Sequence, residues 1–584
     1  MALTYEEMLA RINIDESTAR RHNKRKTAPR QETLTKVLQA SNDLNEMLIF
    51  PYQTAQAKQC KKAQMALAQD EPADIVHRLI ADALAMTGIS EKDYIGKLLL
   101  AQEPELLHTL AKLYAREGEL TKATAMLENV LASLQKLSSN EKYREIKAAP
   151  ILLSLASYRL QAKDFVGALE ACDAGFDISA KREQGRSCPD FLFIKALALA
   201  ALNGLGDLSD KALCQLLLTK AYAGYVALNN AHAAHHVLST AKTKLGIDLQ
   251  TYGMETLLYE LKPKYSNIWD LDDYEKFASL GHVLAYFHKR SGLTSKEVYT
   301  GICGKETFSK LKNDKIKTPN IFVVEALMQR MGRDINLYYS LLVPYKDFDL
   351  VQQRDRVLTL QRAAKYSNAA AALEVFEQIE SSKRDESQVL MQFIRATKAT
   401  LYGATCDRGV EYLKKLQKAL LLTIPHFNER DIARYPLTLR EAVLIQQVAI
   451  YYEMADDAPR AICIYRDLLH NIETRWVDRT LQTSMYTTVS FNYSSCLGRA
   501  GRRREALAVA EKALEYGVTC GDLDGILGLY YNQGYDFLLS NQKNESLPLL
   551  MLSYYASLIF EDYGAADDVQ VTKKTIEENF CVFL

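Results

Sequence analysis

Residues 107–127, LHTLAKLYAREGELTKATAML, contain the pattern that decides the fold class. Apolar or small side chains recur at intervals of three and four residues on both sides of a central glycine, which is the periodicity of two amphipathic helices. The pattern consists of Leu107, Leu110, Ala111, Tyr114, Gly118, Ala123 and Leu127. Because the small residues let two helices approach closely, the stretch predicts a helical hairpin.

The same spacing of small and apolar residues recurs farther along the chain. It is centred on Ala461 and Ala506, and weaker copies are centred on Ala168 and Ala212. The spacing resembles that of tetratricopeptide (TPR) hairpins, which stack into superhelices with a concave binding face. Ala123 and Ala168 are 45 residues apart, as are Ala461 and Ala506, whereas a typical repeat has about 34 residues. We therefore expect an all-α fold with helices lengthened by a turn or two.

The composition agrees with a large helical protein. Glycine (26) and proline (13) are sparse for 584 residues, a length that suggests three or four folding units. The 72 Lys and Arg residues balance the 72 Asp and Glu residues, so attraction to nucleic acid must come from a local basic patch. The ten cysteines lack metal-ligand spacing and are expected to be reduced, which indicates the cytoplasm. No stretch is long and apolar enough to span a bilayer, so no membrane partner is expected.

A longer period relates the two halves of the chain. At an offset of 293, the matching positions are Pro51-Tyr52 with Pro344-Tyr345, Asp164 with Asp457, and Ala168 with Ala461. At an offset of 290, they include Leu3-Thr4 with Leu293-Thr294, Glu7 with Glu297, Asn23 with Asn313, and Pro29 with Pro319. We interpret these matches as a tandem duplication of one unit.

The second unit begins with a series of short helices at residues 274–334. Tyr274 to Arg290 predicts the first helix, which ends at Gly292. Thr294-Ser295-Lys296-Glu297 predicts a capping box that starts the second helix. The remaining signals are a tight turn at Cys303-Gly304-Lys305, a third helix from Glu306 to Asn313, and a fourth that opens at Thr318-Pro319. Such a pair of short helices is the helix-turn-helix arrangement, whose second helix enters the major groove of DNA.

Two segments, LTSKEV (293–298) and KETFSKLKNDKIKTP (305–319), resemble the lambda-repressor-like (XRE) helix-turn-helix. Together with TPR-like repeats, they resemble the Rgg/PlcR type of peptide-responsive transcription regulators of Gram-positive bacteria. The resemblance covers the helix-turn-helix and, more loosely, the chain from Val351 to its end. It implies a DNA-binding regulator, active in quorum sensing, that is controlled by a peptide or protein ligand bound in the TPR-like array.

Four segments are expected from these patterns. They are a truncated helix-turn-helix-like segment (1–50), a first TPR-like array (51–270), a helix-turn-helix DNA-binding domain (271–343) and a second TPR-like array (344–584). The fold class is therefore two TPR-like arrays with a lambda-repressor-like helix-turn-helix between them and a truncated copy at the N-terminus.

The resemblance places one set of residues at double-stranded DNA. These residues are Lys305, Thr307, Ser309, Lys310, Lys312, Asn313, Lys315 and Lys317. The lysines would contact phosphates, and Thr307 or Asn313 would face base edges. Residues 281–335 hold ten Lys and Arg against five Asp and Glu, which makes a local basic patch. Asp314 stands where the family usually has glycine.

The truncated first copy contains a strongly basic counterpart of the recognition helix. Arg20, Arg21, Lys24 and Arg25 are its candidate DNA contacts. This copy is either a second reader, which would make the chain an intramolecular pseudo-dimer, or a degenerate remnant. A homodimer is the other possible arrangement of two readers.

The candidate peptide site lies in the second array. Asn492 and Asn532 each stand beside a tyrosine, Tyr493 and Tyr531, in predicted helices. Carboxamides on a groove can donate to and accept from the backbone of an extended peptide, which is how the resembled family uses such asparagines. The alternative is that these side chains form hydrogen bonds between hairpins.

The sequence contains no P-loop, dinucleotide fingerprint or H-E-x-x-H motif, so we expect neither an enzyme nor a cofactor or metal. Two functions remain open. The first is a peptide-regulated transcription factor, and the second is a TPR-type protein-interaction scaffold with a vestigial helix-turn-helix.

Overall fold

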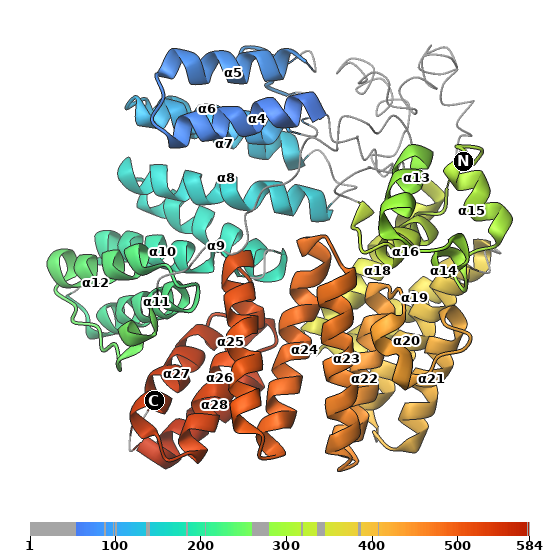
Figure 1. Ribbon diagram of the computed structural model, residues 1–584. Coiled ribbons are helices and arrows are strands. Elements are labelled where there is room, and N and C mark those ends of the chain that lie inside the picture. Colours follow the sequence, from blue (N-terminus) through green and yellow to red (C-terminus); the bar gives the residue numbers. More distant parts are fainter. Residues whose placement is uncertain are drawn as a thin grey trace.

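The computed structural model describes residues 54–86, 89–96, 99, 102–135, 141–182, 185–204, 206–259, 280–316, 319–335, 345–383, 387–406, 408–580, 582 and 584. These residues form α-helices and short 3-10 helices, with no strand among them, which confirms the predicted all-α fold class. Figure 1 shows antiparallel helices stacked side by side in two arrays, with the short helices α13 to α16 between them along the chain.

The first array contains pairs of antiparallel helices that follow one another along the chain. Its elements are α4 (Thr54–Ala68), α5 (Ala73–Ala85), α6 (Glu103–Arg116), α7 (Leu120–Gln135), α8 (Glu141–Gln161), α9 (Phe165–Arg182), α10 (Cys188–Asn203), α11 (Leu208–Ala227), α12 (Ala231–Leu245) and η1 (Met254–Leu257).

The second array repeats this arrangement. Its elements are α18 (Tyr345–Arg362), α19 (Tyr366–Lys383), α20 (Gln388–Thr405), α21 (Val410–Thr423), η3 (Glu429–Arg434), α22 (Leu439–Met454), α23 (Ala458–Arg475), α24 (Arg479–Arg499), α25 (Arg503–Cys520), α26 (Leu523–Leu539), α27 (Lys543–Ser557), η4 (Glu561–Tyr563) and α28 (Ala566–Phe580). Neighbouring first helices also contact each other, as α24 does with α22 and α26.

Most hairpins share one turn geometry. A residue in the left-handed region stands five positions before a small residue that is 0% exposed in the second helix. These pairs are Gly118 with Ala123, Lys163 with Ala168, Asn229 with Ala234, Ala364 with Ala369, Asp456 with Ala461, Gly501 with Ala506, and Asn541 with Ser546. In each turn the next amide bonds back to a carbonyl five residues earlier, as from Asp457 N to Tyr452 O at 2.8 Å. This is the Schellman ending of a helix, and it directs the second helix back along the first.

The hairpins predicted around Ala123, Ala168, Ala461 and Ala506 are therefore confirmed. A hairpin is also present around Ala212, between α10 and α11, but Ala212 is not its buried small residue. Ala212 is exposed in the first turns of α11. The buried residue nearest to it in α11 is Cys214, which is 1% exposed. α10 lies between α9 and α11 as α24 lies between α23 and α25, so the order of helices is the same in both arrays.

Helix bounds repeat at the same offset of 293 that relates the two halves of the sequence. Adding 293 to the bounds of α9 gives 458 and 475, which are the bounds of α23. The same shift carries the end of α8 to the end of α22, the start of α5 to the start of α19, and the end of α11 to the end of α25. The period found in single residues therefore extends to whole helices.

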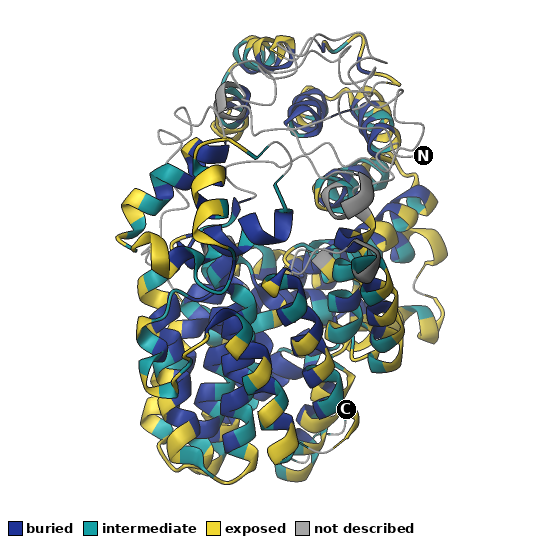
Figure 2. Cartoon of the chain, turned by 90° about the vertical axis from the view of Figure 1, so that its right-hand side faces the viewer, coloured by how far each residue is buried: buried dark blue, intermediate teal, exposed yellow. Residues whose placement is uncertain are grey.

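The two arrays meet over α9 to α11 of the first and α25 to η4 of the second. The Tyr530 hydroxyl donates to the Ala227 carbonyl at 3.0 Å, and Lys220 Nζ donates to the Leu558 carbonyl at 3.0 Å. One buried apolar cluster includes residues of both arrays, among them Leu218 and Leu550. Figure 2 shows the buried residues in dark blue on the helix faces that contact one another. None of the described helices combines the length and the apolar content that crossing a membrane would need.

Candidate nucleic-acid interface

The helix-turn-helix has a complete apolar core. The helix-turn-helix consists of α13 (Leu280–Ser291), α14 (Ser295–Tyr299), α15 (Lys305–Lys312) and α16 (Ile321–Arg330). The side chains at its centre are all buried, and they are Val283, Leu284, Phe287, Val298, Phe308 and Leu311. Because Phe308 and Leu311 fix one face of α15 against α13, the opposite face of α15 points outward.

Local capping sets the bounds of these helices. The predicted capping box is present, because Glu297 Oε2 accepts from Thr294 N at 2.7 Å and Thr294 Oγ1 accepts from Glu297 N at 3.3 Å. The predicted start of the fourth helix at Thr318-Pro319 is wrong. Asn320 caps α16 by accepting from Phe322 N at 2.9 Å, so Pro319 lies before the helix.

The contacts of Asp314 give a reason for an aspartate at the position where the resembled family usually has glycine. Its backbone is left-handed, with φ of 54°, which a short polar residue tolerates. Its Oδ1 accepts from Gly281 N at 2.8 Å, in the first turn of α13. The carboxylate therefore joins the end of α15 to the start of α13, a bond that glycine could not make.

Five of the predicted DNA contacts lie exposed on α15 or just after it. These residues are Lys305, Ser309, Lys310, Asn313 and Lys315, and Thr307 is partly exposed. Lys310 forms an ion pair with Glu306 at 2.8 Å, and Asn313 Nδ2 donates to the Ser309 carbonyl at 2.7 Å. Both groups are exposed, so neither bond prevents them from turning toward a ligand.

Lys312 differs from the other lysines of α15. Its Nζ lies 3.1 Å from His288 Nδ1 and 5.3 Å from the centre of the Phe308 ring. Burial and the Lys312 ammonium lower the pKa of His288, so the histidine accepts from the lysine in its neutral form. Lys312 thus makes a contact inside the domain, and its phosphate contact stays a prediction. Lys317 and the N-terminal candidates Arg20, Arg21, Lys24 and Arg25 lie outside the described residues.

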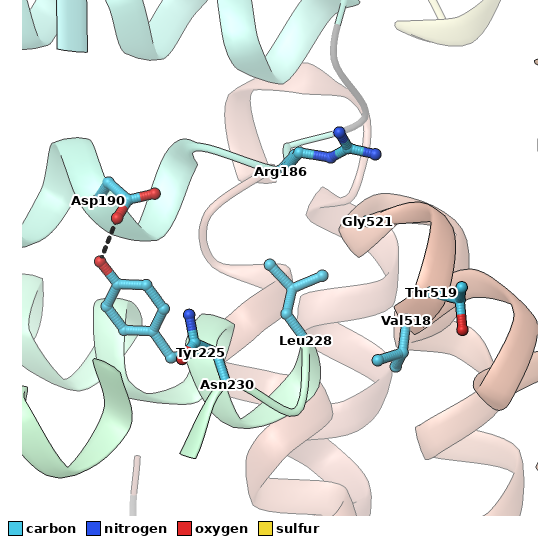
Figure 3. Close-up of a pocket in the computed structure, with 8 residues that line it drawn as sticks. All are labelled: Arg186, Asp190, Tyr225, Leu228, Asn230, Val518, Thr519 and Gly521. Carbon is cyan, nitrogen blue, oxygen red and sulfur yellow. Dashed lines mark hydrogen bonds between the residues drawn. The ribbon is translucent and has the colours of Figure 1, made fainter. Parts of the chain in front are cut away.

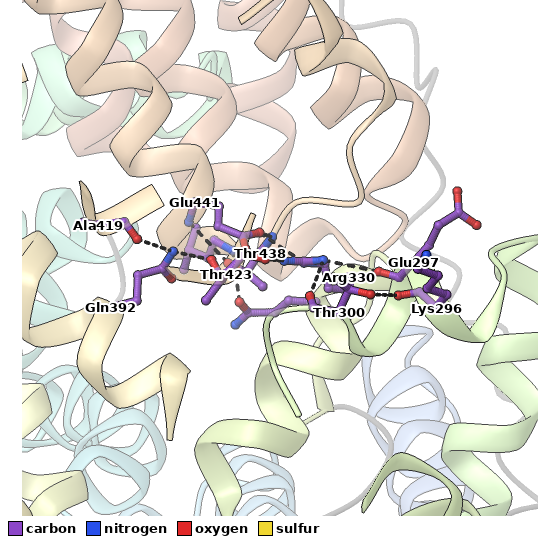
Figure 4. Close-up of polar contacts among 11 residues, drawn as sticks. Lys296, Glu297, Thr300, Arg330, Gln392, Ala419, Thr423, Thr438 and Glu441 are labelled. Carbon is purple, nitrogen blue, oxygen red and sulfur yellow. Dashed lines mark hydrogen bonds and ion pairs between the residues drawn. The ribbon is translucent and has the colours of Figure 1, made fainter. Parts of the chain in front are cut away.

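Arg330, the last residue of α16, holds the helix-turn-helix against the second array (Figure 4). Its side chain is 5% exposed and that of Glu441 is 0% exposed. The guanidinium donates to both oxygens of Glu441, at 3.2 Å from Nε and 2.5 Å from Nη2. It also donates to the carbonyls of Thr423 at 3.0 Å, Glu297 at 3.3 Å and Thr300 at 3.5 Å. Five acceptors thus match the five N–H groups of the guanidinium.

Glu441 has a second role at the start of α22. Its Oε2 accepts from Thr438 N at 2.7 Å, and Thr438 Oγ1 accepts from Glu441 N at 3.2 Å, which forms a capping box. One carboxylate therefore serves both the N-terminus of α22 and the C-terminus of α16. Gln392 of α20 supports the same junction by donating to the Ala419 carbonyl at 3.3 Å and to the Thr423 hydroxyl (Figure 4).

Two close backbone approaches complete this attachment. A Cβ on Gly301 would lie 2.0 Å from the Thr423 carbonyl oxygen, and one on Gly332 would lie 2.0 Å from that of Arg475. Both glycines have positive φ, so no other residue fits there without strain. Asp478 adds an ion pair with Arg333 at 3.0 Å and accepts from Asp334 N at 2.8 Å.

Sequence reasoning missed Arg330, Glu441 and Asp478. An arginine at the end of the apolar stretch IFVVEALMQR was a usable signal, because a charge there needs a buried partner. Glu441 occurs in Thr-Leu-Arg-Glu, which has capping-box spacing, but that pattern does not show the additional partner.

The four candidate peptide contacts differ in burial and in their hydrogen bonds. Asn532 Nδ2 donates to the Phe491 carbonyl at 2.9 Å and to Ser494 Oγ at 2.8 Å, which are bonds between hairpins. Tyr493 is 8% exposed and packs with its ring centre 6.1 Å from that of Tyr465. Asn492 and Tyr531 are partly exposed, and the Tyr531 hydroxyl lies 3.3 Å from Thr575 Oγ1. Asn532 and Tyr493 therefore take part in contacts between helices, whereas Asn492 and Tyr531 stay partly exposed.

A shallow cavity of about 300 Å³ lies where the two arrays meet (Figure 3). It is lined by Arg186, Asp190, Tyr225, Leu228, Asn230, Val518, Thr519 and Gly521. The Tyr225 hydroxyl donates to Asp190 at 2.7 Å, and Arg186 donates to the Cys520 carbonyl. The Arg186 bond joins the two arrays, whereas the bond between Tyr225 and Asp190 lies within the first array. Among the described residues, no group of three or more His, Cys, Asp or Glu side chains is arranged to hold a metal ion.

No protein-family profile matches the chain, and no curated protein matches it in sequence. Among solved structures, it is similar to PlcR of Bacillus thuringiensis in complex with the peptide PapR7 and DNA, with 17% identity and a TM-score of 0.34. That similarity covers 50% of this chain and 98% of PlcR. It is also similar to a chain in the structure of the APC/C hetero-tetramer Cut9–Hcn1, with 12% identity and a TM-score of 0.27. That similarity covers 87% of this chain and 95% of the other chain.

Proposed function

We propose that the chain is a DNA-binding transcription regulator whose helix-turn-helix is fixed to its own second array. The observation that carries the proposal is the composition of α15. One face supplies Phe308 and Leu311 to a complete core, and the other presents exposed Lys305, Ser309, Lys310 and Asn313. A recognition helix needs this combination, because phosphate contacts position it and polar side chains reach base edges.

We propose further that the array takes a short peptide or protein segment, and that the chain acts by binding rather than by catalysis. Asn492 and Tyr531 are the candidates for ligand contact that remain partly exposed. This combination of modules supports assignment to the Rgg/PlcR type, with a cytoplasmic role in quorum sensing in a Gram-positive bacterium. The shared offset of 293 in residues and helix bounds supports a tandem duplication, so a single chain would resemble a dimer of the ancestral unit.

The proposal is tested by DNA binding at graded salt concentrations. Lys305→Gln with Lys310→Gln should weaken binding and reduce the slope of log affinity against log salt by about 2, because each phosphate contact contributes about 0.9. Lys242→Gln with Lys244→Gln, two exposed lysines at the end of α12, is the matched control with the same change of charge. Equal slopes for the two double variants would exclude α15 as the reader.

A protein-interaction scaffold is the second candidate function. The attachment through Arg330 favours it, since a helix-turn-helix that has lost DNA binding can remain as a packing element of the array. The scaffold predicts no binding to any duplex at low salt, whereas the regulator predicts at least non-specific binding there.

A further inference from the structure

The buried apolar residues from the helix-turn-helix onward form two separate clusters. One cluster joins the helix-turn-helix to α18, α19 and the first half of α20, as far as Ile394. The other begins at Ala396 of α20, continues through α21 to α28 and includes α10 to α12 of the first array. No buried apolar side chain of the described residues belongs to both clusters. Because residues of one apolar core move together, we call the first set of helices the small body and the second set the large body.

Polar groups join the helix-turn-helix of the small body to the large body. Arg330 bonds to Glu441 of α22. The amides of Val477 and Asp478 donate to the Gly332 carbonyl at 2.9 and 3.2 Å. When such a joint opens, its donors and acceptors bond to water instead, so the net loss per hydrogen bond is small. Relative motion of two bodies is the expected behaviour of a polar interface.

A second contact between the bodies lies at the last hairpin of the second array. A Cβ on Gly564, between η4 and α28, would lie 2.8 Å from the Arg362 carbonyl oxygen and 3.5 Å from the Ala363 Cα. Arg362 is the last residue of α18 and so belongs to the small body. The φ of 119° at Gly564 also favours glycine. The first and last hairpins of the array therefore touch backbone to backbone, which closes the array on itself.

We propose that the small body opens and closes against the large body as one unit, with the contact between Gly564 and Arg362 as its closure. The connection about which it turns is α20, which contributes Phe393 to one cluster and Ala399 to the other. The proposal rests on the proposed function for its consequence. Since Phe308 fixes α15 in the small body, opening changes the position of α15 relative to the first array, and a ligand that binds the open state better shifts this equilibrium.

Hydrogen exchange of the full chain, followed by mass spectrometry, tests whether the two contacts open together. In the natural protein the Val477 and Asp478 amides should exchange at least about tenfold faster than amides inside α23 and α24, because they need only the opening of the small body. Gly564→Ala should raise both rates further, by about threefold or more, since the added Cβ separates Gly564 from Arg362. Gly501→Ala is the matched control and should leave both rates unchanged. Gly501 also has a positive φ, of 76°, but a Cβ there would meet nothing within 4 Å.

Three outcomes would overturn the proposal. The first is equal exchange at Val477 and Asp478 in the two variants, because opening at Gly564 would then not reach the helix-turn-helix. The second is exchange of these amides in the natural protein that is no faster than inside α23 and α24. The third is an acceleration in Gly564→Ala that extends equally to α11, which would assign Gly564 to the stability of the whole fold.

The interior of the small body supplies an internal reference. The Phe308 amide, which donates to the Gly304 carbonyl at 3.0 Å, should keep its exchange rate in Gly564→Ala, because the small body moves intact. DNA plays no part in these measurements. Failure of the proposed motion therefore leaves the role of α15 to be judged by the salt dependence of DNA binding.

Discussion

Arg330 and Glu441 show how one residue pair joins two kinds of structure. The pair is almost fully buried, so removal of one partner leaves a charge without compensation. Arg330→Met should lower the free energy of unfolding by about 3 kcal/mol or more, measured with urea. Adding Glu441→Gln should recover much of the loss, because glutamine still completes the capping box with Thr438. If the single and double variants were equally unstable, the pair would not be the attachment.

Asp522, at the start of α26, gives the fold a pH dependence. Burial is the main cause that raises its pKa from 3.8 to about 6, and Asp524 adds to it, although a bond from Thr487 opposes the change. Between these two pH values the folded state binds a proton that the unfolded state has released. Stability from this group is therefore complete below pH 3.8 and is lost as the pH rises through 6.

Asp522→Asn should remove this dependence. Asparagine keeps an oxygen for the Gly525 amide, which now donates to Asp522 Oδ1 at 3.1 Å. The difference in unfolding free energy between pH 4.5 and pH 7.5 should change by about 2 kcal/mol relative to the natural protein, measured by urea unfolding at both values. Parallel pH profiles for the two proteins would contradict the role given to Asp522.

At the scale of the hairpin, a buried alanine sets the distance between two helices. Ala461 is 0% exposed in α23, so Ala461→Leu should overpack the contact with α22 and cost about 1–3 kcal/mol. Ala212→Leu is the matched control, because Ala212 is exposed on α11 and the change should be nearly neutral. Urea unfolding measures both, and a large loss at Ala212 would show that this residue is packed between α10 and α11.

Hairpins were predictable because their signals are local. Small residues, caps and turns within about 20 residues of one another place α6 with α7 and α22 with α23. The same signals failed at Ala212, because the turn between α10 and α11 has no buried small residue five positions after its left-handed residue, Gly204. In the candidate site, the exposed face of α15 followed from its apolar face, but the inward turn of Lys312 depends on His288, 24 residues earlier.

At the scale of the whole molecule, the contacts join residues that are hundreds of positions apart. Tyr530 and Ala227 are separated by 303 residues, and Arg186 and Cys520 by 334. A Cβ on Gly564 would lie 2.8 Å from the Arg362 carbonyl, so the end of the second array also touches its first hairpin. No periodicity in one sequence encodes such pairs, because each is created by the curvature that many hairpins add together.

The joint between the arrays is tested most directly at Tyr530. Its hydroxyl is buried and donates to the Ala227 carbonyl, which Tyr530→Phe would leave without this donor. We expect a loss of about 1 kcal/mol and faster hydrogen exchange in α11. Tyr535→Phe is the matched control, because Tyr535 is 40% exposed on the same helix. If α11 exchanged at the same rate in both variants, the hydrogen bond of Tyr530 would have no part in fixing the relative position of the arrays.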